Sequence, residues 1–504
     1  MSPGMRTRDR LASVRSGFGP CGWRAVCVVE NPQPSMIKAD TIDRTPRGEP
    51  RGPRLWLALA AVVVVAACLQ SYGIRTWPMA DDEVPSLVEM GLIHVDPQAF
   101  SVPTQQIERL PKLVPVWYKF QRFAIDRLPK SDVSFRLPSV IFGVLTSALA
   151  FVVAARWRGL WFAAALAIVM NASQPFVYLS QLDRFYSLPL LLMTATLVLM
   201  WIPGRSVLVL PVIAVLAALA VLAHNVTVSV FGLAAVASGA LWLLGRARFE
   251  LAVRSGVAAA VSVLIYVLYL LPLVRGWSST GNPTPVLVSF AAHLGIPTLA
   301  LALLGVSLCA VRRETHVAIR WWALIFCGSV CLLQFTSMTW NPRYFLFFMP
   351  AAWVLGAHAS DVIARQLEDR LSAAAWYGCI VLLLTPNLLS HYLDGSRHDY
   401  RAAASVVMQA NSQNEPILSD DAETISYYLP ESLRRQLFVR TRVKQFPASE
   451  FLLVARSNAW MPLPSVPGRR MELLAEIYRR RFDEFSHILR VYRVAPSPVV
   501  ASSN

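Results

Sequence analysis

About eleven long apolar segments, separated by short loops that carry arginine, run through residues 55–393 of this 504-residue chain. A helix needs about 20 consecutive apolar residues to cross the hydrocarbon core of a bilayer. Only 15% of the residues are charged, against roughly 25% in soluble proteins. The segments are approximately 55–75, 137–155, 160–180, 186–203, 206–223, 227–245, 256–274, 288–311, 321–338, 344–359 and 373–393. The sequence therefore predicts an all-α polytopic membrane protein with about eleven transmembrane helices.

The loops between these segments differ in charge according to the side of the membrane on which they fall. With the N-terminus in the cytoplasm, the inside loops are all basic, as the positive-inside rule requires. They contain Arg156, Arg158, Arg205, Arg246, Arg248, Arg254, Arg312, Arg313, Arg320, Arg365 and Arg370. We expect an integral plasma (inner) membrane protein with a cytoplasmic N-terminus. The net charge of +16 belongs largely to these loops and the tails, so nucleic acid is not an expected partner.

Three regions follow from composition. Residues 1–54 are rich in Arg and Pro and predict a disordered cytoplasmic tail. Residues 55–393 form the transmembrane module, with a first outer loop at 76–136 whose length indicates a functional role. Within that loop, 113–128 predicts an amphipathic helix that either lies in the membrane interface or packs on the bundle. Its apolar face comprises Leu113, Val116, Trp117, Phe120, Phe123, Ala124 and Leu128.

Residues 394–504 are more polar and, with an odd number of spans, fall on the outer side. The pattern predicts a small extracytoplasmic α/β domain. We expect helices at 400–410, 422–429 and 470–482, and strands at 416–419, 451–455 and 488–494. This region shows no separate catalytic set, although Asp420-Asp421 is the pair to inspect.

Two outward-facing motifs combine acids and arginine close to the membrane. Asp81-Asp82-Glu83 follows the first span, where acids serve as bases, as metal ligands or as solvated surface. Asp183-Arg184-Phe185-Tyr186 lies between the third and fourth spans. Charges so close to apolar segments are costly unless they are paired or functional. The motif is therefore either a structural ion pair or a phosphate site that uses the two-pronged guanidinium.

Two further motifs lie on the same predicted side. His224 stands at the outer end of the fifth span, where a lone histidine is more often structural than catalytic. Arg343-Tyr344 precedes the tenth span, where an arginine commonly reaches toward lipid headgroups. The gathering of acids, arginines and a histidine from four segments on one membrane face favours a functional site.

In order and spacing these motifs resemble the GT-C superfamily, particularly the protein O-mannosyltransferases and the lipid A aminoarabinose transferases. Asp82-Glu83 matches the Asp-Glu pair after the first span, and Arg136-Leu137-Pro138-Ser139 with Gly143 matches the start of the next spans. Arg184-Phe185-Tyr186, His224 and Arg343-Tyr344 match the later elements. The chain departs from the pattern where many members carry Pro-Pro-Leu, because it has Lys112-Leu-Val-Pro115 there. The resemblance covers roughly residues 55–393.

The resemblance implies a polyprenyl-phosphate sugar donor and inverting transfer to a hydroxyl of a protein, glycan or lipid acceptor on the extracytoplasmic face. It implies catalytic roles for Asp82 (the base), Glu83 and Asp183. Donor-phosphate binding would fall to Arg184, Arg343 and Tyr344, and substrate binding to His224 and Tyr186. The sequence requires no cofactor, although carboxylate and phosphate oxygens would suit a divalent cation that bridges Asp82 and the donor phosphate.

The alternative function is a transporter or flippase of lipid-linked sugars, and a non-catalytic scaffold is the third. A flippase would keep polar groups through the middle of the bundle. Here the central parts of the spans are nearly free of ionisable residues, and the polar groups gather at one face. This distribution favours an enzyme.

Overall fold

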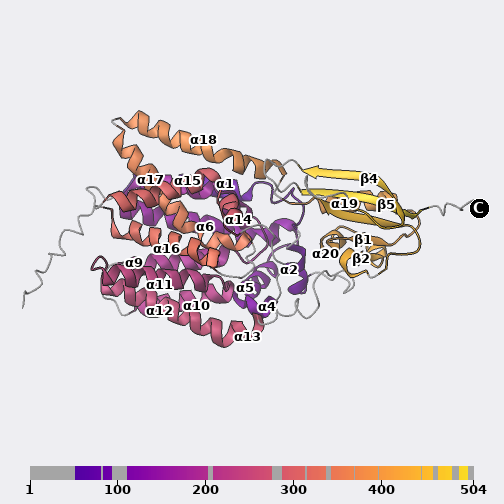
Figure 1. The fold of residues 1–504 in the computed structure, drawn as a ribbon, viewed down its shortest axis with the longest axis horizontal. Coiled ribbons are helices and arrows are strands. Elements are labelled where there is room, and N and C mark those ends of the chain that lie inside the picture. Colours follow the sequence, from indigo (N-terminus) through magenta and orange to yellow (C-terminus); the bar gives the residue numbers. More distant parts are fainter. Residues whose placement is uncertain are drawn as a thin grey trace, which may run out of the picture. The chain divides into compact units, whose positions relative to one another are not determined.

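The computed structural model describes residues 52–80, 83–92, 110–202, 208–274, 286–312, 315–335, 342–367, 369–394, 397–443, 445–457, 464–479 and 487–497. Figure 1 shows a bundle of helices lying side by side and, C-terminal to it in sequence, a small sheet. The first part of the bundle contains α1 (Pro53–Ser71), α2 (Glu83–Glu89), α4 (Leu110–Leu113), α5 (Pro115–Ile125), α6 (Asp132–Arg158), α7 (Leu160–Asn171), α8 (Gln174–Ser180), α9 (Ser187–Trp201), α10 (Val209–Ala223) and α11 (Thr227–Leu243).

The second part of the bundle begins with α12 (Phe249–Ile265), which continues through a π-helical turn at Tyr266–Leu270 into α13 (Leu271–Val274). It goes on with α14 (Val286–Leu294), α15 (Ile296–Val311), α16 (Val317–Phe335), a 3₁₀ turn at Pro342–Phe347, α17 (Met349–Gln366) and α18 (Arg370–Asp394). Each apolar segment predicted from the sequence thus contains helix.

Five helices within the described residues are long and apolar enough to cross a membrane, or up to seven if each of two bent pairs counts as one span. The α7–α8 pair is bent by 68° and the α14–α15 pair by 100°. Gly295 makes the second bend possible, because its φ of 81° is one that other residues rarely adopt. The helices establish an integral membrane protein, and the count of eleven spans stays a prediction.

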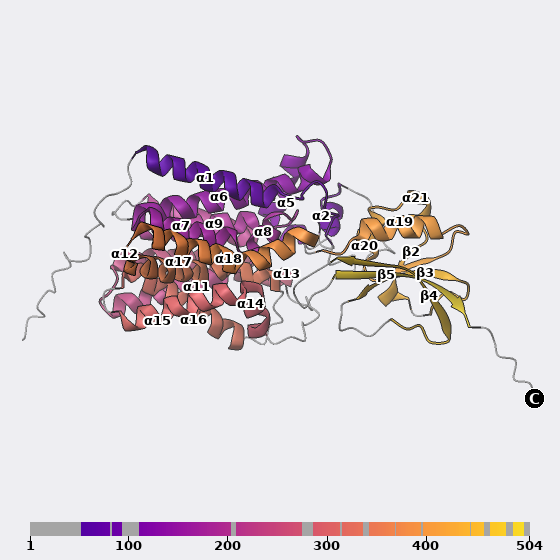
Figure 2. The same cartoon turned by 90° about the horizontal axis from the view of Figure 1, so that it is seen from above.

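Inner and outer helices of the bundle differ in burial. α17 packs against α7, α15 and α16, and nearly all of its residues are buried. α1 and α18 instead expose large apolar side chains, among them Trp56, Val64 and Leu382. Because the bundle is a membrane structure, these exposed residues face lipid. Figure 2 shows α1 along one edge of the bundle.

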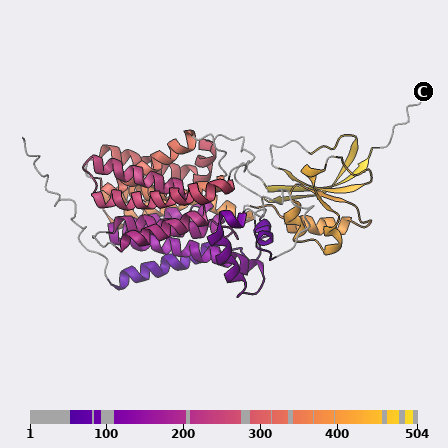
Figure 3. The same ribbon diagram turned by 90° about the horizontal axis from the view of Figure 1, so that it is seen from below.

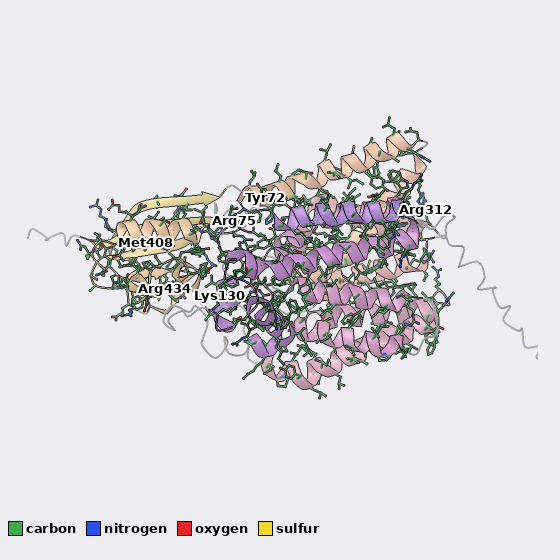
Figure 4. The ribbon with its side chains drawn as sticks, turned by 180° about the vertical axis from the view of Figure 1, so that it is seen from behind. Tyr72, Arg75, Lys130, Arg312, Met408 and Arg434 are labelled. Atoms are coloured by element: carbon green, nitrogen blue, oxygen red, sulfur yellow. The ribbon has the colours of Figure 1, made fainter. Side chains whose placement is uncertain are left out.

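Polar and charged residues mark the two ends of the bundle. Figure 4 shows Arg312 at one end, and Tyr72, Arg75 and Lys130 at the other. α6 connects these ends. It starts with Ser131 as N-cap, whose hydroxyl accepts from the Ser134 amide (3.2 Å), and it stops at Gly159, where φ is 94°.

The C-terminal region forms a five-stranded mixed sheet with the order β2-β1-β3-β5-β4. Its elements are α19 (Tyr400–Ala410), β1 (Ile417–Ser419), α20 (Ala422–Ser426), α21 (Glu431–Arg434), β2 (Leu437–Val439), a 3₁₀ turn (Arg440–Arg442), β3 (Phe451–Ser457), β4 (Arg469–Arg479) and β5 (His487–Pro496). β1 pairs in parallel with β2 and β3, and β5 pairs antiparallel with β3 and β4. α19 packs its buried face against one side of this sheet.

The α/β character of this region is confirmed, but the helix predicted at 470–482 is wrong. Those residues include Glu, Leu and Ala, which favour helices in isolation. In the structure Arg469–Arg479 instead form β4, which pairs along its length with β5. Cross-strand pairing therefore outweighs local propensity here.

Asp420 and Asp421 form hydrogen bonds and ion pairs within the C-terminal domain. Asp421 caps α20 by accepting from the Thr424 amide (3.2 Å) and forms an ion pair with Arg456. Asp420 accepts from the Arg456 amide (2.8 Å) and lies 3.3 Å from Arg440. Both acids are thus occupied by contacts within the domain.

Candidate active site

Figures 1 and 2 place α2 and α5 at one end of the bundle, and the same indigo and purple segments lie at that end in Figure 3. The centre of this region is Glu83, the first residue of α2, which is completely buried. Its carboxylate accepts from Nε and Nη2 of Arg136 (2.7 Å each) and from the Ala80 amide (2.7 Å). It also accepts from the Asp183 amide (2.9 Å) and from Nη1 of Arg397 (3.3 Å). These donors occupy the roughly four lone-pair sites that a carboxylate offers.

Arg136 explains how the loop after α1 is held. Its guanidinium, buried near the start of α6, donates to the carbonyls of Ile74 (2.7 Å), Trp77 (3.1 Å) and Pro78 (2.9 Å). Burial alone would raise the pKa of Glu83, but Arg136 and Arg397 outweigh it and lower that pKa below its ordinary value. Glu83 is therefore an ionised anchor with no free lone pair for a substrate proton.

Asp183, which the sequence predicted as catalytic, lies beside this cluster. It is completely buried, and its Oδ1 accepts from Nε2 of Gln121. Its Oδ2 has no hydrogen-bond partner within the part of the chain that the structure describes. Burial, together with the neighbouring Glu83 carboxylate, raises the pKa of Asp183 well above its ordinary value. Asp183 therefore holds a proton more readily than an exposed aspartate.

Gln121 reaches Asp183 from α5, and the predicted orientation of this helix needs correction. Phe120 and Phe123 were expected on its apolar face, yet their exposed fractions are 37% and 54%. The buried face instead contains Trp117, Tyr118, Gln121 and Ile125. The helix packs on the bundle, and it directs two polar side chains inward. A glutamine at helical spacing among buried aromatic residues is the signal that the sequence offered.

Arg184 lies in a second buried cluster. Its Nη1 is 3.6 Å from Oε2 of Glu89, and its guanidinium stands 5.0 Å from the ring of Phe185. The hydroxyl of Tyr118 donates to Glu89. Burial raises the pKa of Glu89, although Arg184 and Tyr118 oppose the rise. Sequence reasoning did not identify Glu89 or Tyr118, because neither belongs to a recognisable motif.

His224 lies among aromatic side chains from other motifs. Its ring lies 4.8 Å from Tyr344, 4.6 Å from Phe347 and 6.0 Å from Tyr186. Nδ1 accepts from the Val226 amide (3.2 Å), so in a neutral ring the proton is on Nε2. Tyr186, His224 and Tyr344 thus come together from three distant segments.

Gly143 is required by a close approach between helices. A Cβ at this position would stand 2.2 Å from Oε1 of Gln70 and 2.6 Å from Oγ of Ser180. Next to it, Gln181 donates to the carbonyl of Leu69 (3.0 Å) and accepts from His391 (2.7 Å). These contacts fix the segment that leads into Asp183 and Arg184.

Two predicted residues cannot be placed. Asp82 and the side chain of Arg343 lie outside the described residues. Among those that are described, no group of three or more His, Cys, Asp or Glu side chains could hold a metal ion.

No protein-family model and no curated protein matches the sequence. The fold is similar to that of ArnT from Cupriavidus metallidurans bound to undecaprenyl phosphate, with a TM-score of 0.51 at 13% identity over 87% of this chain and 98% of that one. For the apo state of ArnT the TM-score is 0.51 at 14% identity, over 87% and 97%. For the oligosaccharyltransferase AglB from Archaeoglobus fulgidus the TM-score is 0.45 at 12% identity, over 79% and 69%. ArnT is a lipid A aminoarabinose transferase of the GT-C superfamily, and the chain shares its fold.

Proposed function

We propose that this protein is a membrane glycosyltransferase that moves a sugar from a polyprenyl-phosphate carrier to a hydroxyl of a protein, glycan or lipid acceptor. The observation that carries the proposal is the meeting of Asp183, Arg184, Tyr186, His224 and Tyr344 at one end of the bundle. A fold shared with a transferase that was solved with undecaprenyl phosphate supports it. The basic loops predicted at the opposite end favour an extracytoplasmic site.

In this reaction the acceptor oxygen bonds to the anomeric carbon on the face opposite the phosphate, which inverts its configuration. The carbon–oxygen bond to the phosphate breaks, and its electron pair leaves with the polyprenyl phosphate. Asp82 takes the hydroxyl proton as general base. Arg184, Arg343 and Tyr344 stabilise the charge that grows on the departing phosphate. His224 and Tyr186 contact the substrate.

The other two acids have different roles in this proposal. Glu83 positions the loop after α1 through Arg136, since its lone pairs are already occupied. Asp183 orients substrate groups from its buried position beside Glu83, where Gln121 donates to its carboxyl group.

The test is release of polyprenyl phosphate by the purified protein in nanodiscs, with a panel of polyprenyl-phosphate sugars and an envelope acceptor fraction. Wild type should release the carrier with at least one donor. Asp82→Asn should lose about 10²- to 10⁴-fold, the usual contribution of a general base. The matched control is Asp126→Asn, since Asp126 is an exposed acid at the end of α5, and it should behave as wild type.

Two outcomes would count against the proposal. Full activity of Asp82→Asn would remove the base assignment. No release by well-folded wild type with any donor in the panel would reject the transferase and favour transport of lipid-linked sugars.

A further inference from the structure

Arg397 enters the candidate site from a part of the chain that the motifs do not include. It lies between α18 and α19, and its side chain is only 1% exposed. Its Nη1 donates to the carbonyl of Pro78 (3.0 Å) and to Oε2 of Glu83 (3.3 Å). The segment that leaves the last helix of the bundle is thereby joined to the anchor of the loop after α1.

Aromatic rings fix the position of this guanidinium. It stands 5.3 Å from the ring of Trp77 and 5.8 Å from the ring of Tyr178. Trp77 in turn packs against His391 of α18 at 5.0 Å. Contacts of a cation with aromatic faces are favourable and directional. Arg397 is therefore held by residues from three elements, and its contact with Glu83 is well defined.

Charge balance does not require this arginine. Arg136 alone, with two hydrogen bonds to the carboxylate, neutralises Glu83. Burial and the nearby charge of Arg136 lower the pKa of Arg397 to about 10. A second buried cation beside the first adds a desolvation cost. A role of Arg397 beyond neutralising Glu83 would explain why this cost is tolerated.

The contacts of Glu83 show where that role would act. Its Oε1 accepts from the Asp183 amide at 2.9 Å, and Arg184 is the next residue in the chain. We propose that Arg397 is a positioning residue, which fixes Glu83 and, through Glu83, the backbone that carries Asp183 and Arg184. This inference rests on the proposed function for its effect on catalysis. It means that the segment between α18 and the C-terminal domain helps to set the donor-phosphate site.

The experiment compares Arg397→Gln with Arg401→Gln in the full-length protein. Arg401 is the matched control: it binds Asp132 at 3.1 Å and the Thr76 carbonyl at 3.2 Å from the same C-terminal segment, its side chain is 43% exposed, and no hydrogen bond or ion pair among the described residues joins it to Glu83. We expect Arg397→Gln to lower kcat about tenfold or more with little change in the KM for the donor. Arg397→Lys should recover part of this loss, because it restores the charge but not the planar fork. Arg401→Gln should stay within about threefold of wild type.

The pH profile separates positioning from general destabilisation. Among the described residues, the charged or titratable groups that face Glu83 are Arg136, Arg397 and Asp183. Removing the charge of Arg397 raises the pKa of Glu83, so the acidic limb of the kcat profile should move to higher pH in Arg397→Gln and stay in place in Arg401→Gln. Equal kcat values and equal acidic limbs in the two variants would overturn the proposal. If Arg397→Gln does not fold, wild-type kcat in Arg397→Lys overturns it.

A readout without activity keeps this inference distinct from the proposed function. Amide hydrogen exchange of residues 83–92 and 182–186 should be faster in Arg397→Gln than in Arg401→Gln. Equal exchange would overturn the positioning role even in an active enzyme. Faster exchange in a protein that releases no polyprenyl phosphate would support the positioning role and reject the transferase.

Discussion

The two ends of α6 carry similar charged groups in different surroundings. Near its start Arg136 meets Glu83 and a second arginine, Arg397. Its last residue, Arg158, meets Asp361 and a second arginine, Arg365. Arg136 and Arg158 are 22 residues apart in this helix, so about 33 Å separate the two clusters. Both acids are completely buried.

The clusters differ in hydrogen bonding and in contact with solvent. Glu83 accepts two short bonds from Arg136, and both of its arginines are buried. Asp361 accepts from Nε of Arg365 at 3.0 Å, whereas Arg158 stands 3.5 Å away. Oδ2 of Asp361 accepts no hydrogen bond from the described residues. The side chain of Arg365 is 54% exposed. Solvent can therefore stabilise a charge left unpaired in the Asp361 cluster, but not one left unpaired in the Glu83 cluster.

The largest effect should separate Glu83→Gln from Asp361→Asn. Glu83→Gln leaves two buried arginines without a carboxylate, so we expect a loss of about 3–5 kcal/mol in the free energy of unfolding. Asp361→Asn should cost about 1 kcal/mol or less, because Arg365 reaches solvent. Thermal unfolding of both variants in the same detergent measures the difference. Equal losses of unfolding free energy in the two variants would contradict the proposed difference between the Glu83 and Asp361 clusters.

The next largest effect is expected on the transfer rate when arginine is replaced by lysine at the two ends of the bundle. Arg184→Lys should reduce transfer about 10- to 100-fold, because an ammonium cannot reproduce the planar fork toward a phosphate. Arg158→Lys, at the far end of α6, should stay within about threefold of wild type. Steady-state rates over a range of donor concentrations test both variants. Wild-type turnover and donor affinity in Arg184→Lys would mean that Arg184 is a structural partner of Glu89.

The smallest effect concerns Asp183. Burial and the Glu83 carboxylate raise the pKa of Asp183, and asparagine resembles the protonated form of this side chain in shape and polarity. We expect Asp183→Asn to lower transfer by less than about tenfold. Transfer rates of Asp183→Asn and Asp82→Asn, measured in the same assay, test this expectation. A loss as large as that of Asp82→Asn would show that Asp183 acts in its ionised form and would move the base assignment to it.

The sequence was informative where the chemistry of the membrane leaves few choices. Long apolar stretches without charge can only become helices in a bilayer, since each backbone polar group must be satisfied within the segment. The helical bundle was therefore predictable, and so was the resemblance to a GT-C fold. The sequence was misleading at β4, where residues that favour helices pair with β5 instead.

The site was only partly predictable for a related reason. Asp183, Arg184, His224 and Tyr344 belong to short motifs at the ends of spans, and such positions can be read from the chain. Glu89 and Tyr118 lie in short helices of a loop, where nothing local distinguishes them from surface residues. Their role depends on which face of α5 is buried, which is decided by packing.

By itself the sequence determined a membrane bundle and the set of charged residues near its ends. The tertiary structure decided which of these residues act together. Arg136 and Arg397 are 261 positions apart in the chain, yet both bind Glu83. Because the energy of a buried charge depends on the partners around it, only the folded chain could show that Arg136 and Arg397 share Glu83 and that Arg184 lies beside Glu89.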